Sequence, residues 1–302
     1  MSIFYESKDW YRTTNLTDYP CSLKGDVEVR AKNNGVEVFI DGESSLVWNG
    51  TLDKTYSGVG FSAGTGGYTN NHFIDDVEIN EDIKPTVETI KDDFSLDTGL
   101  WNYMGCASRL TEGVARLTPN ENWKAGAMWL KTQTSNSFTT KFKYKSGESS
   151  VGKNSDGFTY MFYKKQDEIG NSGEAQGFAA NSGYGIEFDS FYNGSANEGI
   201  GQNSAHISLI KNSTIQNNWG AGPKMLAYNV NSDIVNKLTD NNYHDVEVRV
   251  SDNTVQVYID TIKAIDYKGT LDTTYRGTGF SGATGGYNQK NLIDNFEIAI
   301  KR

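Results

Sequence analysis

The stretch YGIEFDSFYN, residues 184–193, brings together groups that bind cations. Side chains alternate along a β-strand, so the carboxylates of Glu187 and Asp189 point to one face, within about 7 Å of each other. Phe191 and Asn193 follow on that same face. Two neighbouring carboxylates repel each other unless a cation balances them. A half-exposed strand whose acidic face is simply solvated is the alternative interpretation.

Further donors follow this strand. A loop rich in Gly, Ser and Asn carries Glu198, and the next expected strand opens near His206. An oxygen-rich site of the kind that binds Ca²⁺ would draw on Asp189, the backbone carbonyl of Phe191, Asn193 and Glu198. Glu187 and His206, sharing Asp189, would form a neighbouring site suited to Mn²⁺ or another transition ion. An ordinary strand-start role is the alternative for His206.

Short strand-like segments must position these groups. They are rich in Val, Thr, Phe and Tyr, and Gly, Asn and Asp separate them. Besides residues 184–193, strands are expected at residues 137–145, 157–165, 204–210, 245–251, 254–260, 277–284 and 292–300. Only residues 229–238 have helical character. Many short strands with turn residues between them predict an all-β chain folded as an antiparallel β-sandwich.

The chain contains an internal repeat. Residues 25–79 align without gaps with residues 244–298, and about half of the aligned positions are identical. Nothing before residue 25 matches residues 93–193, so the first copy corresponds to the rear part of a unit. The sequence therefore predicts a partial unit at 1–80, a polar linker containing Pro85 at 81–92, and a complete unit at 93–302. We expect the parent protein to be a tandem array.

Composition excludes several classes of partner. The formal charge of −10 argues against nucleic acid and anionic membranes, which need a basic patch. No apolar run approaches the roughly 20 residues of a membrane span, so no membrane insertion is expected. The start, MSIFYESKDWYRTT, lacks the pattern of a signal peptide. Cys21 and Cys106 have no spacing motif, which favours independent thiols over one disulfide.

The order of these motifs resembles that of the L-type lectins, the legume-lectin-like group that includes plant seed lectins and the cargo lectins of the secretory pathway. SDGFTYMFY is similar to the family's ADG-led strand, YHDVEVRV to its W-H-led strand, and TGFSGATGGYNQKNLIDNFEI to its closing segment. The family's metal loop, E-x-D-x-aromatic-x-N with a later His, is matched by Glu187, Asp189, Phe191, Asn193 and His206. Glu198 stands where the family has Asp. The resemblance implies a concanavalin A-like jelly roll.

The resemblance also implies a sugar site beside the Ca²⁺. Asp156, in NSDG, and Asn193 stand where the family binds sugar hydroxyls, and the peptide Ser155–Asp156 would be cis. The family's Gly-rich loop corresponds to GNSGEAQG, and its closing loop to ATGGY. The residues expected near the sugar in these loops are Gly173 or Gly177, Gly285, Gly286 and Tyr287.

Structural roles stay open for several of these residues. Asp156 is also a plausible turn residue before Gly157. GTGGY recurs at residues 64–68, in the copy without the metal strand, so Gly285 and Gly286 are equally suited to a structural turn.

The resemblance implies a calcium-dependent, carbohydrate-binding module of an extracellular or cell-surface, adhesin-like protein, with glycans as partners. The partial unit is a candidate surface for self-association. A structural spacer with a degenerate sugar site is the alternative. A glycoside hydrolase is disfavoured, because Phe191 and Tyr192 stand where the second Glu of E-x-D-x-E or E-x-D-x-x-E would be. The chain is therefore expected not to be an enzyme.

Overall fold

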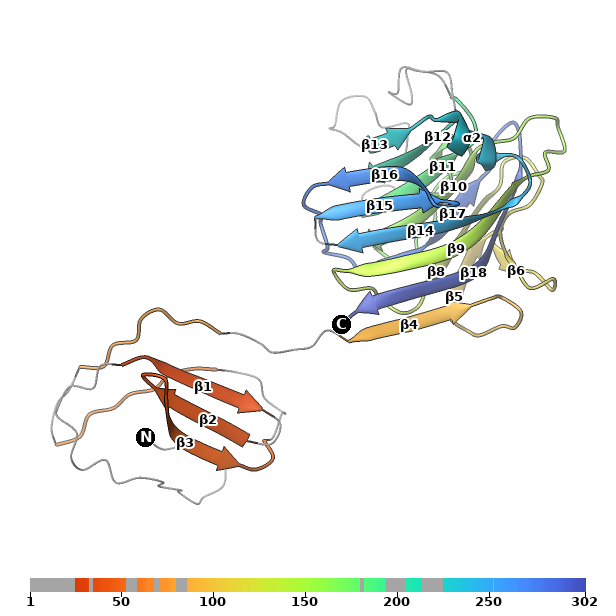
Figure 1. The fold of residues 1–302 in the computed structure, drawn as a ribbon. Helices are drawn as coiled ribbons and strands as arrows, with labels where there is room; N and C mark the ends of the chain where they lie inside the picture. The colour runs from red at the N-terminus through yellow and green to blue at the C-terminus, as the bar shows by residue number, and fades with distance from the viewer. Residues whose placement is uncertain are drawn as a thin grey trace. The chain divides into compact units, whose positions relative to one another are not determined.

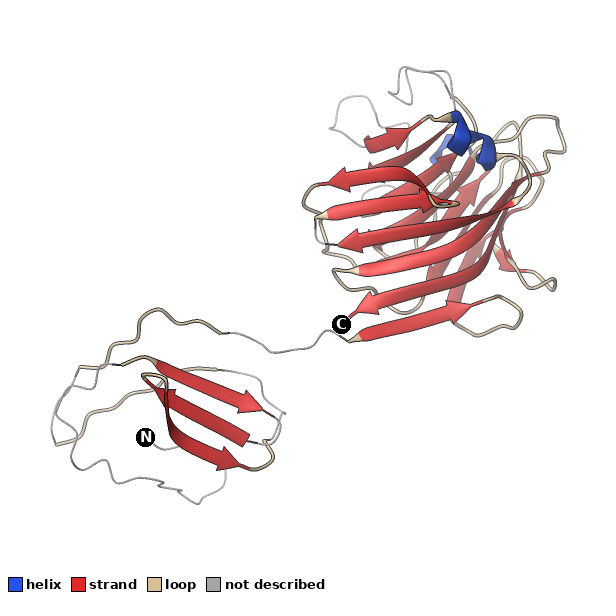
Figure 2. Cartoon of the chain, viewed as in Figure 1, coloured by secondary structure: helices blue, strands red, loops and turns tan. Residues whose placement is uncertain are grey.

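A computed structural model describes residues 25–32, 35–52, 59–67, 71–79, 86–179, 182–193, 205–212, 225–251 and 253–302. The described residues form antiparallel strands with three short helical segments (Figure 1 and Figure 2). Contacts divide the chain into two units, Met1–Asn80 and Glu81–Arg302. The second unit is an antiparallel β-sandwich, which confirms the predicted fold class.

In the second unit, the sheet that we name the front sheet, which lies behind the other sheet in the view of Figure 1, has seven strands in the order β13-β12-β11-β10-β17-β8-β5. Their bounds are Trp101–Gly105 for β5, Ala125–Leu130 for β8, Gly157–Lys164 for β10, Tyr184–Asp189 for β11, His206–Lys211 for β12, Met225–Asn229 for β13 and Gly277–Ala283 for β17. Every neighbouring pair is antiparallel.

The back sheet has eight strands. Seven follow the order β16-β15-β14-β9-β18-β7-β6, and β4 also pairs with β18. Their bounds are Val87–Asp92 (β4), Ser108–Arg109 (β6), Ala115–Thr118 (β7), Phe138–Gly147 (β9), Tyr243–Ser251 (β14), Thr254–Ile259 (β15), Ile262–Lys268 (β16) and Lys290–Lys301 (β18). The helical segments are η1 (Gly173–Ala175), α2 (Ser232–Val235) and η3 (Asn236–Leu238), the last two within the stretch predicted as helical. None of the described helices has the length and apolar character to cross a membrane.

Strand β4 corrects the predicted domain boundary. It lies in the stretch 81–92 that the sequence predicts as a linker, yet it pairs with β18 along its whole length. Its last residue, Asp92, is 5% exposed and accepts hydrogen bonds from Thr98 Oγ1 at 2.8 Å and Trp101 Nε1 at 3.0 Å. The sandwich therefore begins before residue 93, because these contacts fix β4 to the body of the unit.

Aromatic side chains from the inner faces of the two sheets form the core. Phe142 of β9 packs edge to face on Phe280 of β17, with ring centroids 4.9 Å apart. Phe158 of β10 stacks on Phe188 of β11 at 4.3 Å. Because Phe188 points inward, its neighbours Glu187 and Asp189 point to the outer face of the front sheet.

A loop covers this outer face. Phe178, in the loop that follows η1, packs on a small apolar cluster made of Trp129, Met161 and Ile210. The same loop is held by Lys164, whose Nζ donates to the carbonyls of Ala179 and, at 3.0 Å, of Ser182. Burial lowers the pKa of Lys164 to about 8. Polar groups on the outer face of the front sheet are consequently shielded from water.

The first unit contains a three-stranded sheet, β1 (Val27–Lys32), β2 (Gly35–Ile40) and β3 (Glu43–Asn49). Its pairing register matches that of β14, β15 and β16. Val27 lies opposite Ile40, and the aligned residues Val246 and Ile259 lie opposite each other in the second unit. The two copies of the repeat therefore fold their first three strands alike.

The rest of the first copy differs from the second. Residues 59–67 and 71–79 align with β17 and β18 but form no strand. Phe61 is 66% exposed and Ile79 is 64% exposed, whereas the aligned Phe280 and Ile298 are fully buried. Apolar strands need an opposing layer to bury them. The part of this unit that the structure describes shows no such layer.

Of the two cysteines, Cys106 lies in the described part of the chain. Cys106 is half-buried, and its Sγ donates to Leu117 O at 3.3 Å. Within the described part of the chain it is a free cysteine. Cys21 lies outside the described residues.

Candidate metal and ligand site

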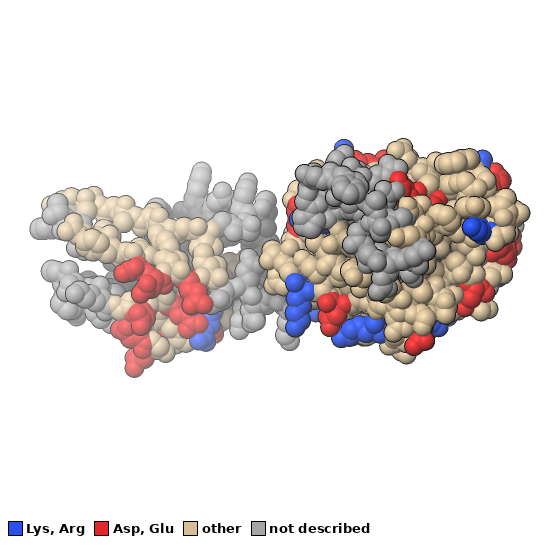
Figure 3. Space-filling model, turned by 90° about the horizontal axis from the view of Figure 1, so that it is seen from above, with Lys and Arg blue, Asp and Glu red and all other residues tan. Residues whose placement is uncertain are grey.

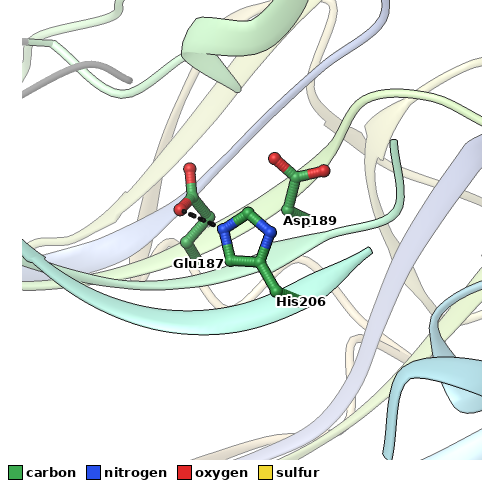
Figure 4. A group of neighbouring side chains, drawn as sticks. All are labelled: Glu187, Asp189 and His206. Carbon is green, nitrogen blue, oxygen red and sulfur yellow. Dashed lines mark ion pairs between the residues drawn. The ribbon is translucent and has the colours of Figure 1, made fainter. Parts of the chain in front are cut away.

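The structure brings together Glu187 and Asp189 on β11 with His206 on β12 (Figure 4). One potential ligand atom from each side chain lies within 4.8 Å of the others. All three side chains are at most 1% exposed. In Figure 4 one imidazole nitrogen faces Glu187, and the other is turned toward the side of Asp189.

Strand register fixes this cluster. Asp189 lies opposite His206, and Glu187 lies opposite Ser208. Ser208 Oγ donates to Glu187 Oε2 at 2.6 Å, and His206 Nε2 lies 3.5 Å from the same oxygen. The sequence patterns did not predict Ser208 as a site residue. Its position two residues after His206, on the same face of a strand, is the signal that would have identified it.

The cluster fits a divalent cation. Two carboxylates are buried side by side, which is costly for two negative charges unless positive charge accompanies them. A donor set of carboxylate oxygen and imidazole nitrogen suits a transition ion such as Mn²⁺. Oxygen donors from the adjoining loop would suit Ca²⁺.

That loop begins earlier than the sequence predicts. Strand β11 ends at Asp189, so Phe191 and Asn193 lie on a turn and not on the strand face. Phe191 N donates to Asp189 Oδ1 at 2.7 Å, and this bond bends the chain back over the carboxylate. Both Phe191 and Asn193 are half-buried. Glu198 lies outside the described residues.

Asp156 adjoins the cluster through the backbone. Its carbonyl accepts hydrogen bonds at 2.9 Å from both the backbone N and the Oγ of Ser190, the residue after Asp189. The Ser155–Asp156 peptide is cis. Asp156 is 4% exposed, and burial, with the nearby charge of Glu174, raises its pKa to about 7. Its Oδ2 has no hydrogen-bond partner among the described residues, and a buried acceptor of this kind is typical of a ligand site.

Two loops approach this carboxylate. A β-carbon built on Gly285 would lie 2.9 Å from Asp156 Oδ2, so a larger residue there would displace this carboxylate. The loops are joined by a hydrogen bond from Gly173 N to Thr284 O at 3.0 Å. Gly286 is exposed, and the Tyr287 ring lies 5.5 Å from that of Phe191. Asp156, Gly285, Tyr287 and Phe191 therefore line one region.

Gly177 packs against the strands of the front sheet. It is buried, and a β-carbon there would meet Gly282 O at 2.9 Å and Gly126 O at 3.2 Å. Packing against strands β17 and β8 thus explains the need for glycine at this position. Of the two glycines named from the Gly-rich loop, Gly173 is the one beside Gly285.

The model of the legume-like lectin family matches residues 95–298. The chain belongs to the legume-like lectin family. The match covers the sandwich that holds Asp156 and the cluster of Glu187, Asp189 and His206, as the motif order predicts. Membership of this family also agrees with the prediction that the chain is not an enzyme. No curated protein sequence matches the chain.

Solved structures show the same fold as this legume-like lectin. The VIP36 exoplasmic/lumenal domain in its Ca²⁺/Man3GlcNAc-bound form is 19% identical, has a TM-score of 0.57 and covers 69% of this chain and 86% of its own. The Lotus tetragonolobus seed lectin is 16% identical with a TM-score of 0.59, covering 71% and 99%. The Bauhinia forficata lectin in complex with GalNAc is 17% identical with a TM-score of 0.57, covering 71% and 98%.

The surface of the lectin unit has mixed charge. In the view of Figure 3, Lys and Arg side chains are interspersed with Asp and Glu over the described part of this unit. On this face the described residues form no clustered basic patch of the kind that nucleic-acid-binding proteins present.

Proposed function

We propose that this chain is a calcium-dependent carbohydrate-binding module of an extracellular or cell-surface, adhesin-like protein with tandem lectin units. The observation that carries the proposal is the buried acceptor Asp156 Oδ2 beside the Glu187, Asp189 and His206 cluster. A spacer domain has no need to bury these groups together, because placing two carboxylates side by side in a buried position costs free energy.

Residues of the chain divide into two roles under this proposal. Asp189, the Phe191 carbonyl, Asn193 and Glu198 would hold Ca²⁺, and Glu187 with His206 would add a second divalent cation that shares Asp189. When bound, Ca²⁺ supplies fixed positive charge that holds the loop after β11 in one conformation. Asp156 then accepts hydrogen bonds from sugar hydroxyls, and the Asn193 amide accepts and donates. Gly286 and Tyr287 form the rim of the pocket.

The comparisons support glycans as the partner class. The VIP36 domain is bound to Man3GlcNAc, and the Bauhinia forficata lectin is bound to GalNAc. These are different sugars on one fold, so loop residues and not the sandwich decide the specificity. The lumenal location in the name of the VIP36 domain is compatible with a role outside the cytosol.

Removal of Ca²⁺ tests the proposal. Restoring Ca²⁺ at 100 times its dissociation constant, after EDTA treatment, is expected to raise the melting temperature of the sandwich by about 5–10 °C, because the cation binds only the folded state. Glycan-array signal should appear with Ca²⁺ and vanish with EDTA. A chain that responds to Ca²⁺ in neither assay would be a structural spacer.

The first unit supplies a proposed surface for self-association. Its exposed apolar residues include Val27, Val29 and Phe61, and a second copy of the chain presents the same surface. Burial of such surface drives symmetric association.

Substitution of this surface is expected to weaken self-association. Val29→Thr combined with Phe61→Ser should raise the dimer dissociation constant about tenfold, measured by sedimentation velocity over a concentration series. Val87→Thr, at an exposed valine of β4, is the matched control. A wild-type chain that stays monomeric at every concentration would contradict the proposal.

A further inference from the structure

Trp123 is an exposed aromatic residue with a fixed backbone. It lies between β7 and β8, is 67% exposed and has φ of 57°. A bulky residue in the left-handed region is a real conformational outlier and costs free energy. Single exposed apolar residues are ordinary, but one held in a strained conformation calls for a physical explanation.

Hydrogen bonds on both sides of Trp123 hold that conformation. Trp123 N donates to Gly285 O at 3.1 Å, and the Asn122 side chain donates to Gly286 O at 2.8 Å. On the other side, Lys124 N donates to Thr284 Oγ1 at 2.9 Å. The indole is therefore presented by the closing loop of the proposed sugar site, although about 160 residues separate the two segments.

The closing loop places Asp156 and Trp123 each beside one of two consecutive glycines. Gly285 abuts the Asp156 carboxylate, and a β-carbon on Gly286 would come within 3.9 Å of Trp123 Cζ2. The Cα atoms of consecutive residues are about 3.8 Å apart, so the carboxylate and the indole border neighbouring points of one loop. Gly286 has no side chain that could block the space between the Asp156 carboxylate and the Trp123 indole.

We propose that Trp123 forms a second sugar subsite, at which its indole face stacks on the C–H face of a pyranose adjoining the one bound at Asp156. The ligand class is therefore an oligosaccharide of two or more residues and not a free monosaccharide. This inference rests on the proposed glycan-binding function and extends it. A rigid aromatic platform contributes binding energy at little entropic cost, because the loop contacts order it before the ligand arrives.

The test compares ligands of different length on the full chain in Ca²⁺. The probes are methyl glycosides of mannose, galactose, N-acetylglucosamine and N-acetylgalactosamine, and linear disaccharides and trisaccharides that end in each sugar. Trp123→Ala is expected to weaken binding of the best trisaccharide about tenfold by calorimetry and to change monosaccharide affinity less than twofold. Trp123→Phe should recover part of the loss. Tyr275→Ala is the control. It removes another exposed aromatic residue, which lies just before the first residue of β17, whereas the closing loop follows the last residue of that strand. This variant should change neither affinity.

Each outcome decides a separate point. If monosaccharides bind and trisaccharides bind no better, or if Trp123→Ala weakens both equally or neither, the subsite is wrong and the primary site stands. If no sugar binds to the wild-type chain in Ca²⁺, the subsite and the proposed function both fail. Since Trp123 is mostly exposed, its substitution should leave the melting temperature unchanged, so loss of fold does not complicate the comparison.

Discussion

Asp189→Asn is expected to abolish stabilisation by Ca²⁺ and to weaken glycan binding at least about 100-fold. Both proposed cation sites would use Asp189, so the substitution removes the charge that the two sites share. The amide keeps an oxygen at the position that accepts from Phe191 N, which preserves the turn after β11. The loss should therefore come from the missing charge.

The melting temperature supplies the internal check. In EDTA the melting temperature of the variant should equal or exceed that of the wild type, because the negative charge of residue 189 beside Glu187 is removed. In Ca²⁺ the order should reverse. Asp266→Asn, at an exposed carboxylate of β16, is the control and should respond to Ca²⁺ like the wild type. An unchanged Ca²⁺ response in Asp189→Asn would remove this residue from the metal site.

Asp156→Asn is expected to weaken glycan binding by about 100-fold while the Ca²⁺ response is retained. A buried site that hydrogen-bonds a sugar hydroxyl loses much of its affinity when one of its side chains changes, because polar groups are then left without hydrogen bonds. Asn has nearly the shape of Asp, so Gly285 and the loops around it can stay in position. Glycan affinity within threefold of the wild type would exclude Asp156 from the pocket.

The pH dependence of stability provides a second readout for the same variant. Burial raises the pKa of Asp156 to about 7 from an ordinary 3.8, so the folded state favours the protonated carboxyl. The resulting stabilisation is complete below pH 3.8 and is lost as the pH rises through 7. Asn stays neutral throughout. In EDTA, the melting temperature of the variant minus that of the wild type should therefore increase from pH 5 to pH 8.

Much of the fold was predictable because its strands alternate. Segments such as residues 137–145 and 245–251 place apolar side chains at every second position, and they became β9 and β14. Strand β8 was missed, since AGAMWL is buried on both faces and shows no alternation. Strand β4 was missed because its partner lies about 200 residues away, in β18, and local sequence carries no trace of that pairing.

The site was predictable to the same extent. Period-two spacing placed Glu187 and Asp189 on one face, and strand pairing brought His206 to them. The position of Gly177 was not predictable, because it depends on how the Gly-rich loop folds onto β17. The position of Trp123 beside the site was likewise not predictable, since its contacts with Gly285 and Gly286 join segments that are distant along the chain.

The placement of β18 affects how the protein folds as it is synthesised. This strand lies in the middle of the back sheet, with β9 on one edge and β4 and β7 on the other, and it is the last strand of the unit. Until it arrives, its neighbours have unpaired edges, which are open to incorrect partners. The nascent chain contains such a partner, because residues 71–79 align with β18 and are made first.

Asn291 distinguishes the two closing segments. It is fully buried in β18, where its amide donates to Thr118 Oγ1 at 2.8 Å and accepts from Ser146 Oγ at 2.8 Å. The aligned residue of the first copy is His72, which cannot reproduce this set of hydrogen bonds. Mispairing of residues 71–79 with β9 would leave Thr118 and Ser146 without these bonds, at a cost in free energy. One buried amide thereby favours the correct strand over its near-copy in the first unit.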